Sequence, residues 1–164
     1  MCVTNVTNVT AKNEPLYMTR GLRNNNPLNI RNGYSRWVGK ANKQTDPHFV
    51  CFMTKAMGYR AAWKIMYSYL LRMQAEGMDY TLRNIITRWA PPTENDTETY
   101  IHTVVGLMPF SMEPDQPLPP PHLKEGKLVM SEVMAAMTCV ENGIGMDEVP
   151  REEIERGWQL AFGK

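Results

Sequence analysis

The chain has 164 residues, a formal net charge of +1 and 43% hydrophobic residues, which suits one globular domain with a real core. Its near-neutral charge and lack of a Lys/Arg run give no positive electrostatic potential that would attract nucleic acid, so no nucleic-acid partner is expected. No stretch reaches about 18 apolar residues, so no membrane span is expected. Three cysteines without CxxC spacing argue against a zinc site or a disulfide framework.

The most unusual segment is Arg20–Arg31, which follows a predicted flexible tail over residues 1–19 and opens a single predicted domain over residues 20–164. It holds three consecutive asparagines, then Pro27 and Asn29. Asn competes with its own backbone for hydrogen bonds, so this run predicts an ordered turn tied by side chains. Two interpretations stay open: a structural knot of amide–backbone bonds, or a polar site for a ligand rich in hydroxyl and amide groups, such as a sugar.

Strand-like segments follow at residues 29–31, 36–39 and 49–52. The Asn32-Gly33 pair between the first two segments is a strong hairpin signal, and residues 42–47 form a less certain turn. We therefore expect a small antiparallel sheet in this part of the chain.

Beyond residue 52 the apolar residues recur every three or four positions, which predicts amphipathic helices. The proline-rich residues 109–121 are predicted to be an extended surface connection. A small sheet followed by five helices predicts an α+β fold. The helices are expected over about 57–76, from a cap at Thr81 to Trp89, from a cap at Thr93 or Asn95 through Val105, and over about 128–140 and 150–162.

Two glutamates are candidates for glycoside chemistry, which needs a carboxylic acid kept protonated near neutral pH. Glu141 ends an apolar helix, where partial desolvation would favour the neutral acid; an ordinary solvated side chain in a last turn is the alternative. Glu94 lies between Trp89 and Tyr100, whose rings would suit a sugar-binding wall. The helix dipole alone also explains acids in a first turn.

The histidines and cysteines offer less. His48, His102 and His122 have no metal-ligand spacing, so neither a metal nor another cofactor is expected. Cys51 and His48 are three residues apart in a predicted strand and would point to opposite faces, which disfavours amidase or peptidase chemistry.

Three segments carry a family resemblance: Arg20–Arg31, Ile85–Tyr100 and Glu141–Gly143. They resemble phage and prophage proteins that are often called virion structural proteins and are suspected to be lysozyme-like, peptidoglycan-degrading enzymes. A looser similarity links the chain to cell-wall glucosaminidases and lytic transglycosylases, in which a catalytic Glu ends a helix. Because the Glu-bearing helix lies toward the C-terminal end here, the similarity implies a circularly permuted lysozyme-like fold.

The resemblance implies cleavage of the glycan strand of peptidoglycan, by a lysozyme or transglycosylase route, with Glu141 or Glu94 as general acid. A non-catalytic virion or secretion-apparatus module that binds the wall is the alternative. With no secretion signal at its start, the protein is expected to be made in the bacterial cytoplasm and to reach the wall after release or inside a virion. Substrate-binding roles are implied for Asn25, Asn26, Asn29, Arg31, Trp89 and Tyr100.

Overall fold

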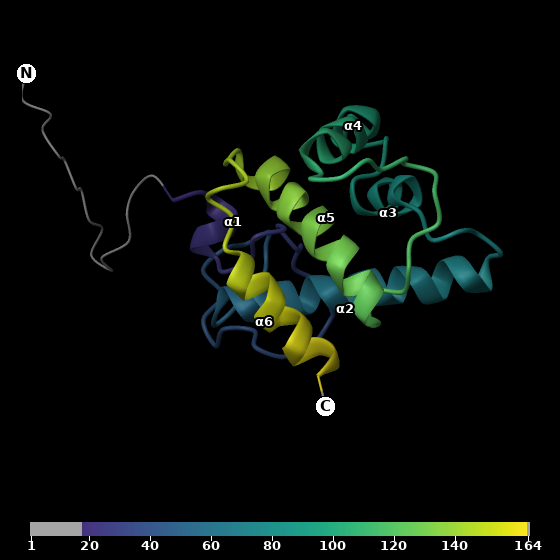
Figure 1. Ribbon diagram of the computed structural model, residues 1–164. Coiled ribbons are helices and arrows are strands. Elements are labelled where there is room, and N and C mark those ends of the chain that lie inside the picture. The colour runs from purple at the N-terminus through teal and green to yellow at the C-terminus, as the bar shows by residue number, and fades with distance from the viewer. Residues whose placement is uncertain (1–17, 164) are drawn as a thin grey trace, which may run out of the picture.

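The computed structural model describes residues 18–163, so residues 1–17 of the predicted tail lie outside the described residues. Within that range the chain forms six helices (Figure 1). They are α1 (Arg20–Arg23), α2 (Lys55–Ala75), α3 (Leu82–Trp89), α4 (Thr97–Leu107), α5 (Lys124–Asn142) and α6 (Arg151–Phe162).

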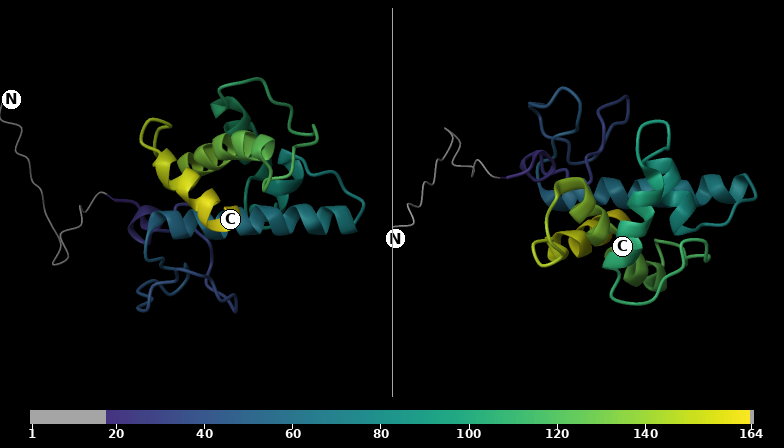
Figure 2. Two further views of the ribbon diagram at one scale, coloured as in Figure 1. Left: turned by 60° about the horizontal axis from the view of Figure 1, so that its bottom comes forward. Right: turned by 90° about the horizontal axis from the view of Figure 1, so that it is seen from above.

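The long helix α2 divides the molecule into two regions. Helix α6 packs along α2, α5 packs on both α4 and α6, and α3 packs on α4. We call α2 to α6 the helical bundle. Residues 24–54, which we call the loop lobe, form no helix and project from the opposite side of α2 from α3, α4 and α5 (Figure 2).

The core of the bundle is built from large side chains that are fully buried, such as Trp63, Met66, Ile86 and Met134. Burying each of them removes apolar surface from water and contributes about 1.5–3 kcal/mol. The Trp63 indole also donates to the Ile154 carbonyl at 3.1 Å, which fixes α6 on α2. None of the described helices is both long and apolar enough to cross a membrane.

The five helices predicted from apolar periodicity are confirmed, with bounds shifted by a few residues. Thr81 caps α3 as expected, because its hydroxyl accepts from the Asn84 amide at 3.1 Å. The cap of α4 is Asp96 rather than Thr93 or Asn95. The four-residue helix α1 was not predicted, because one turn carries no measurable period.

The proline-rich segment connects α4 to α5 without any helix, as predicted. It is more deeply buried than the predicted surface connection, since Met112 and Leu118 are part of the core. The Leu118 amide donates to the Tyr80 carbonyl at 2.8 Å, which pins the segment beside α3.

The predicted α+β fold, with a small sheet before the helices in a lysozyme-like, circularly permuted arrangement, is wrong for the residues that the structure describes. Residues 18–163 contain three isolated antiparallel bridges and no sheet. Even the expected hairpin at Asn32-Gly33 is absent, because Arg31 is bridged to Phe49 in a distant segment.

Backbone pairing in this region is short and is mixed with side-chain bonds to the same groups, as where the Ile30 carbonyl accepts from both the Val50 amide and the Asn26 side chain. The Asn26 amide donates to the Ile30 and Val50 carbonyls, both at 2.9 Å, and its oxygen accepts from the Ile30 amide at 2.9 Å. Gln44 satisfies both backbone groups of Cys51 at 2.8 Å. Polar side chains thus compete with regular structure in the loop lobe, where the backbone pairs that do form remain isolated bridges.

Candidate active site

Glu141 lies in the last turn of α5, where the helix stops at a left-handed glycine. Gly143 has φ of +63°, and its amide donates to the Cys139 carbonyl at 2.8 Å. Glycine adopts this conformation without steric penalty, so the Glu-Asn-Gly sequence is a helix C-terminal cap. The cap fixes the backbone that carries the candidate acid.

Asn142 ties this end of α5 to the N-terminal part of the chain. Its amide donates to the Thr138 carbonyl at 2.9 Å and to the Pro27 carbonyl at 2.7 Å. Its oxygen accepts from the Thr19 hydroxyl at 2.6 Å. Asn142 therefore holds the loop lobe against the helix from which Glu141 projects.

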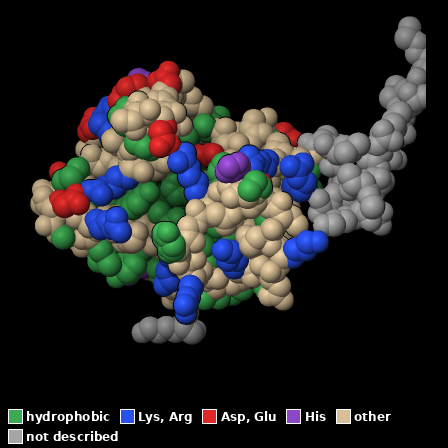
Figure 3. All heavy atoms as spheres, turned by 180° about the vertical axis from the view of Figure 1, so that it is seen from behind, with side chains coloured by type: hydrophobic (Ala, Val, Ile, Leu, Met, Phe, Trp, Pro, Cys, Tyr) green, Lys and Arg blue, Asp and Glu red, His purple; other side chains and the backbone are tan. Residues whose placement is uncertain are grey.

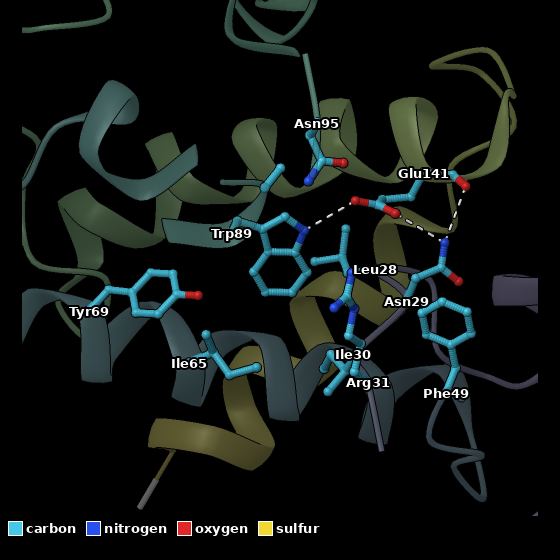
Figure 4. A pocket seen from close by; sticks show the side chains of 11 residues that line it. Leu28, Asn29, Ile30, Arg31, Phe49, Ile65, Tyr69, Trp89, Asn95 and Glu141 are labelled. Carbon is cyan, nitrogen blue, oxygen red and sulfur yellow. Dashed lines mark hydrogen bonds between the residues drawn. The ribbon is translucent and has the colours of Figure 1, made fainter. Parts of the chain in front are cut away.

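Three side chains from three segments donate hydrogen bonds to the Glu141 carboxylate. The Trp89 indole and the Tyr100 hydroxyl donate to Oε1 at 3.1 and 3.0 Å. The Asn29 amide donates to Oε2 at 3.0 Å and lies 3.3 Å from the Glu141 carbonyl (Figure 4). The carboxylate is therefore held in one orientation by α3, α4 and the loop lobe together.

Asn29 is itself held in an unusual backbone conformation. Its φ is +51°, a left-handed value that Asn tolerates. Its backbone N–H donates to the backbone carbonyl of Asn26 at 3.0 Å. A Cβ at Gly21 would lie 2.8 Å from Asn29 Oδ1 and 2.7 Å from Asn142 Oδ1. A glycine at position 21 is thus what lets α1 press against both amides that position Glu141.

Tyr100 is nearly buried, at 8% exposure. Burial, followed by the charge of Glu141 and the hydrogen bond to it, raises the pKa of Tyr100 well above its ordinary value. The phenol therefore keeps its proton and remains a donor to the carboxylate across the neutral range.

A cleft of about 360 Å³ opens beside this carboxylate, between the loop lobe and the bundle. Figure 3 shows a hollow on this face, with hydrophobic side chains gathered inside it and Lys and Arg side chains around it. Among the described residues that line the cleft, Glu141 is the single acid. The others are Leu28, Asn29, Ile30, Arg31, Phe49, Ile65, Tyr69, Trp89, Ala90 and Asn95.

Glu94, the rival candidate, does not line the cleft. Its carboxylate accepts from the Arg31 guanidinium at 2.6 Å, and both side chains are well exposed to solvent. Arg31 and the neighbouring Asn95 do line the cleft, so Glu94 belongs to its rim. Of the two glutamates, the structure therefore places Glu141 in the cavity.

The predicted substrate-binding residues divide into two groups. Asn29, Arg31 and Trp89 line the cleft, and Tyr100 touches Glu141 from behind it. Asn26 is fully buried in its bonds to backbone groups, and Asn25 donates to the carbonyls of residues 52 and 53, both at 3.2 Å. The asparagine run is thus partly a structural knot and partly a cleft wall.

Several lining residues were not singled out from the sequence. Ile65 and Tyr69 lie four residues apart on α2, where apolar spacing predicts the buried face of a helix, yet they are only partly buried and line the cleft. Phe49 was assigned to a strand. A tyrosine on an apolar helix face was the one available signal, because its hydroxyl favours a position at the edge of a core.

The histidines and cysteines of the described residues do not form a metal-binding cluster. Among residues 18–163, no three His, Cys, Asp or Glu side chains are close enough to hold a metal ion. Cys51 is buried, with its Sγ 3.6 Å from the Thr45 hydroxyl, whereas His48 is exposed.

Comparison with known proteins places the chain among phage proteins. No family model matches it. It is 35% identical over 146 residues to Protein P5 of Pseudoalteromonas phage PM2, an alignment that covers 87% of this chain and 82% of Protein P5. This confirms the phage part of the resemblance, while the lysozyme-like part stays a prediction. The chain belongs to the same protein family as Protein P5 of phage PM2.

Proposed function

We propose that this protein cleaves the glycan strand of peptidoglycan, with Glu141 as the general acid and base. The observation that carries the proposal is a carboxylate in the cleft, the single acid among its described lining residues, which is oriented by three donors from three segments. Such orientation is typical of a catalytic group that must meet its substrate at a fixed angle. Membership of a phage protein family supplies the biological setting.

The cleft walls suit a sugar. Trp89, Tyr69 and Phe49 present aromatic surface, which packs on the apolar faces of pyranose rings. Asn29, Asn95 and Arg31 present polar groups for hydroxyl and acetamido substituents. A cavity of about 360 Å³ lies within the range of small-molecule sites and would hold part of a longer strand.

With one carboxylate among the residues that the structure describes in the cleft, a transglycosylase route fits best. Glu141 gives its proton to the glycosidic oxygen, and the bond from that oxygen to the anomeric carbon breaks. A hydroxyl of the same sugar then attacks the anomeric carbon and closes a ring, and its proton returns to Glu141. Hydrolases of the common types instead use two carboxylates about 5–9.5 Å apart.

The donors also distinguish the two oxygens of the carboxylate. Oε1 accepts from both Trp89 and Tyr100, whereas Oε2 accepts from Asn29 alone among the side chains. Oε2 therefore has the freer lone pair, and we assign the proton transfer to it.

The test is mass spectrometry of the soluble products that purified peptidoglycan releases with the wild type, Glu141→Gln and Glu94→Gln. We expect anhydro-sugar ends from the wild type and a loss of about 10²–10⁴-fold in Glu141→Gln, the usual contribution of a general acid. Glu94→Gln is the matched control and should stay within severalfold of the wild type. Reducing ends would instead indicate a hydrolase. No product beside an active control lysozyme would overturn the proposal.

A second candidate is a wall-binding or assembly module without catalysis. One observation favours it: a carboxylate bonded to three segments is also a good structural anchor. This candidate predicts that the wild type binds peptidoglycan without releasing product, and that Glu141→Gln lowers stability instead of turnover.

A further inference from the structure

The charges of this nearly neutral chain are sharply divided along the sequence. Residues 18–64 hold nine Lys or Arg residues and a single acidic residue, Asp46. Residues 65–163 hold seven basic and fifteen acidic residues. Figure 3 shows Lys and Arg side chains spread over much of this face and Asp and Glu side chains mainly at its upper left. One wall of the cleft is therefore part of a cationic region that the overall charge hides.

A second pocket, of about 470 Å³, lies in this cationic region beside the cleft. Arg31 and Phe49 line both cavities, so a ligand could continue from one into the other. The second pocket is completed by Arg20, Asn32, Pro47 and His48. No acidic side chain is among its described lining residues.

The guanidinium of Arg20 is fixed in place but retains free donors. It donates to both oxygens of Asp46, at 2.6 and 2.7 Å, and stacks 4.6 Å from the Phe49 ring centroid. Arginine has five N–H donors, so three remain for a ligand. Its side chain is 44% exposed, so part of it faces solvent.

The two acids that pair with the arginines of the pocket, Asp46 and Glu94, are not among its lining residues. Asp46 is buried, and it accepts from Arg20, from the Asn24 amide at 2.8 Å and from two backbone amides. Arg31 pairs with Glu94 only at the solvent-exposed rim, where such a pair is weak enough for a ligand to displace.

We propose that this second pocket binds carboxylates on the peptide stems of the same strand whose sugars occupy the cleft. The identity of the polymer rests on the proposed function; the anionic character of the ligand rests on the pocket. Guanidinium groups bind carboxylates through paired, charge-assisted hydrogen bonds. A stem that branches from a sugar in the cleft would reach Arg20 and His48 across the wall formed by Arg31 and Phe49.

The experiment places one negative charge in the pocket and one elsewhere. His48→Glu and the matched control His102→Glu change the same type of exposed side chain by the same charge, on the loop lobe and on α4 respectively. Each is made in the full chain that carries Glu141→Gln, to stop turnover. Binding is measured by co-sedimentation with intact sacculi and with sacculi whose carboxylates have been amidated.

We expect amidation of the sacculi to weaken binding by about fivefold or more. His48→Glu should weaken binding to intact sacculi by about the same factor, whereas His102→Glu should stay within about twofold of the parent Glu141→Gln protein. His48→Glu should also remove most of the difference between intact and amidated sacculi. Equal binding by the two variants, or no effect of amidation, would overturn the proposal. Equally effective competition by a DNA fragment would also overturn it, because the pocket would then be a general anion site.

The wild type on the same sacculi separates this proposal from the proposed function. Product release that is insensitive to amidation and to His48→Glu would overturn the stem pocket alone. Stem-dependent binding with no product would overturn the catalytic function and leave the pocket in place.

Discussion

The loop lobe and the helical bundle are held together by different interactions. In the bundle, side chains such as Met66 and Ile86 are fully buried and fill volume. In the lobe, buried polar side chains such as Asn24, Asn26 and Asp46 form hydrogen bonds to specific backbone and side-chain atoms. The bundle therefore depends on shape and apolar area, and the lobe on the identity of single atoms.

The largest expected effect comes from Asn26→Asp, which keeps the side-chain volume and removes the amide donor. It places a carboxylate oxygen against the Ile30 and Val50 carbonyls in a fully buried site. We expect a loss of about 3–5 kcal/mol in the free energy of unfolding, as for other uncompensated buried charges. Urea denaturation, followed by circular dichroism, measures the loss.

The matched control is Met66→Leu, a volume-conserving change at an equally buried position in the bundle. It should reduce stability by less than about 1.5 kcal/mol. Similar losses in both variants would mean that the lobe does not depend on atom identity more than the bundle does.

Asp46→Asn should have a smaller effect that depends on pH. Hydrogen bonds from Arg20 first, then from Asn24 and two backbone amides, hold the pKa of Asp46 well below its usual range. The native pKa is depressed, so the stabilisation is complete above about pH 4 and is lost as the pH falls below it. We expect Asn to reduce stability by about 2 kcal/mol at pH 7.

Unfolding midpoints at pH 7, 4 and 2 test this dependence: the gap between the wild type and Asp46→Asn should narrow toward acid. Asp115→Asn is the control in the bundle. Asp115 pairs with Arg83 at the surface with 69% exposure, so its change should stay below about 1 kcal/mol. A gap for Asp46→Asn that is constant with pH would contradict the assigned ion pair.

The sequence predicted the bundle well because its information is local. Apolar spacing and caps such as Thr81 lie within one helix, so a window of a dozen residues contains the evidence. The lobe was mispredicted because Asn26 bonds to Val50, 24 residues away, and no local pattern reveals which backbone group an amide will take. Asn32-Gly33 favours a local hairpin, but the residues beside it pair instead with a more distant segment, as the bridge from Arg31 to Phe49 shows.

The candidate site shows the same division. Glu141, Asn29, Trp89 and Tyr100 were singled out by residue type, and the structure brings them together. Their meeting could not be deduced, because it depends on how α3, α4, α5 and the lobe pack. For the same reason, the sequence could not choose between Glu141 and Glu94.

The smallest expected effect on the free energy of unfolding is at Gly143, next to the end of α5 that Asn142 holds against the loop lobe. Gly143→Ala puts a Cβ on a residue with φ of +63°, and we expect it to lower stability by about 1 kcal/mol. Gly106→Ala, at an open position within α4, should instead raise stability by about 0.5–1 kcal/mol. Thermal melts compare them; a loss in both variants would show that added bulk, rather than backbone conformation, is responsible.

The packing of α6 on α2 has a consequence for synthesis of the chain. Trp63 donates to the carbonyl of Ile154, 91 residues further along. At about 5–20 residues per second, a ribosome needs roughly 5–18 seconds to bridge that interval. For this time the apolar face of α2 emerges without its cover, in a form that chaperones with affinity for apolar segments can recognise. The nascent protein therefore completes its core, and with it the setting of Glu141, only after α6 has been synthesised.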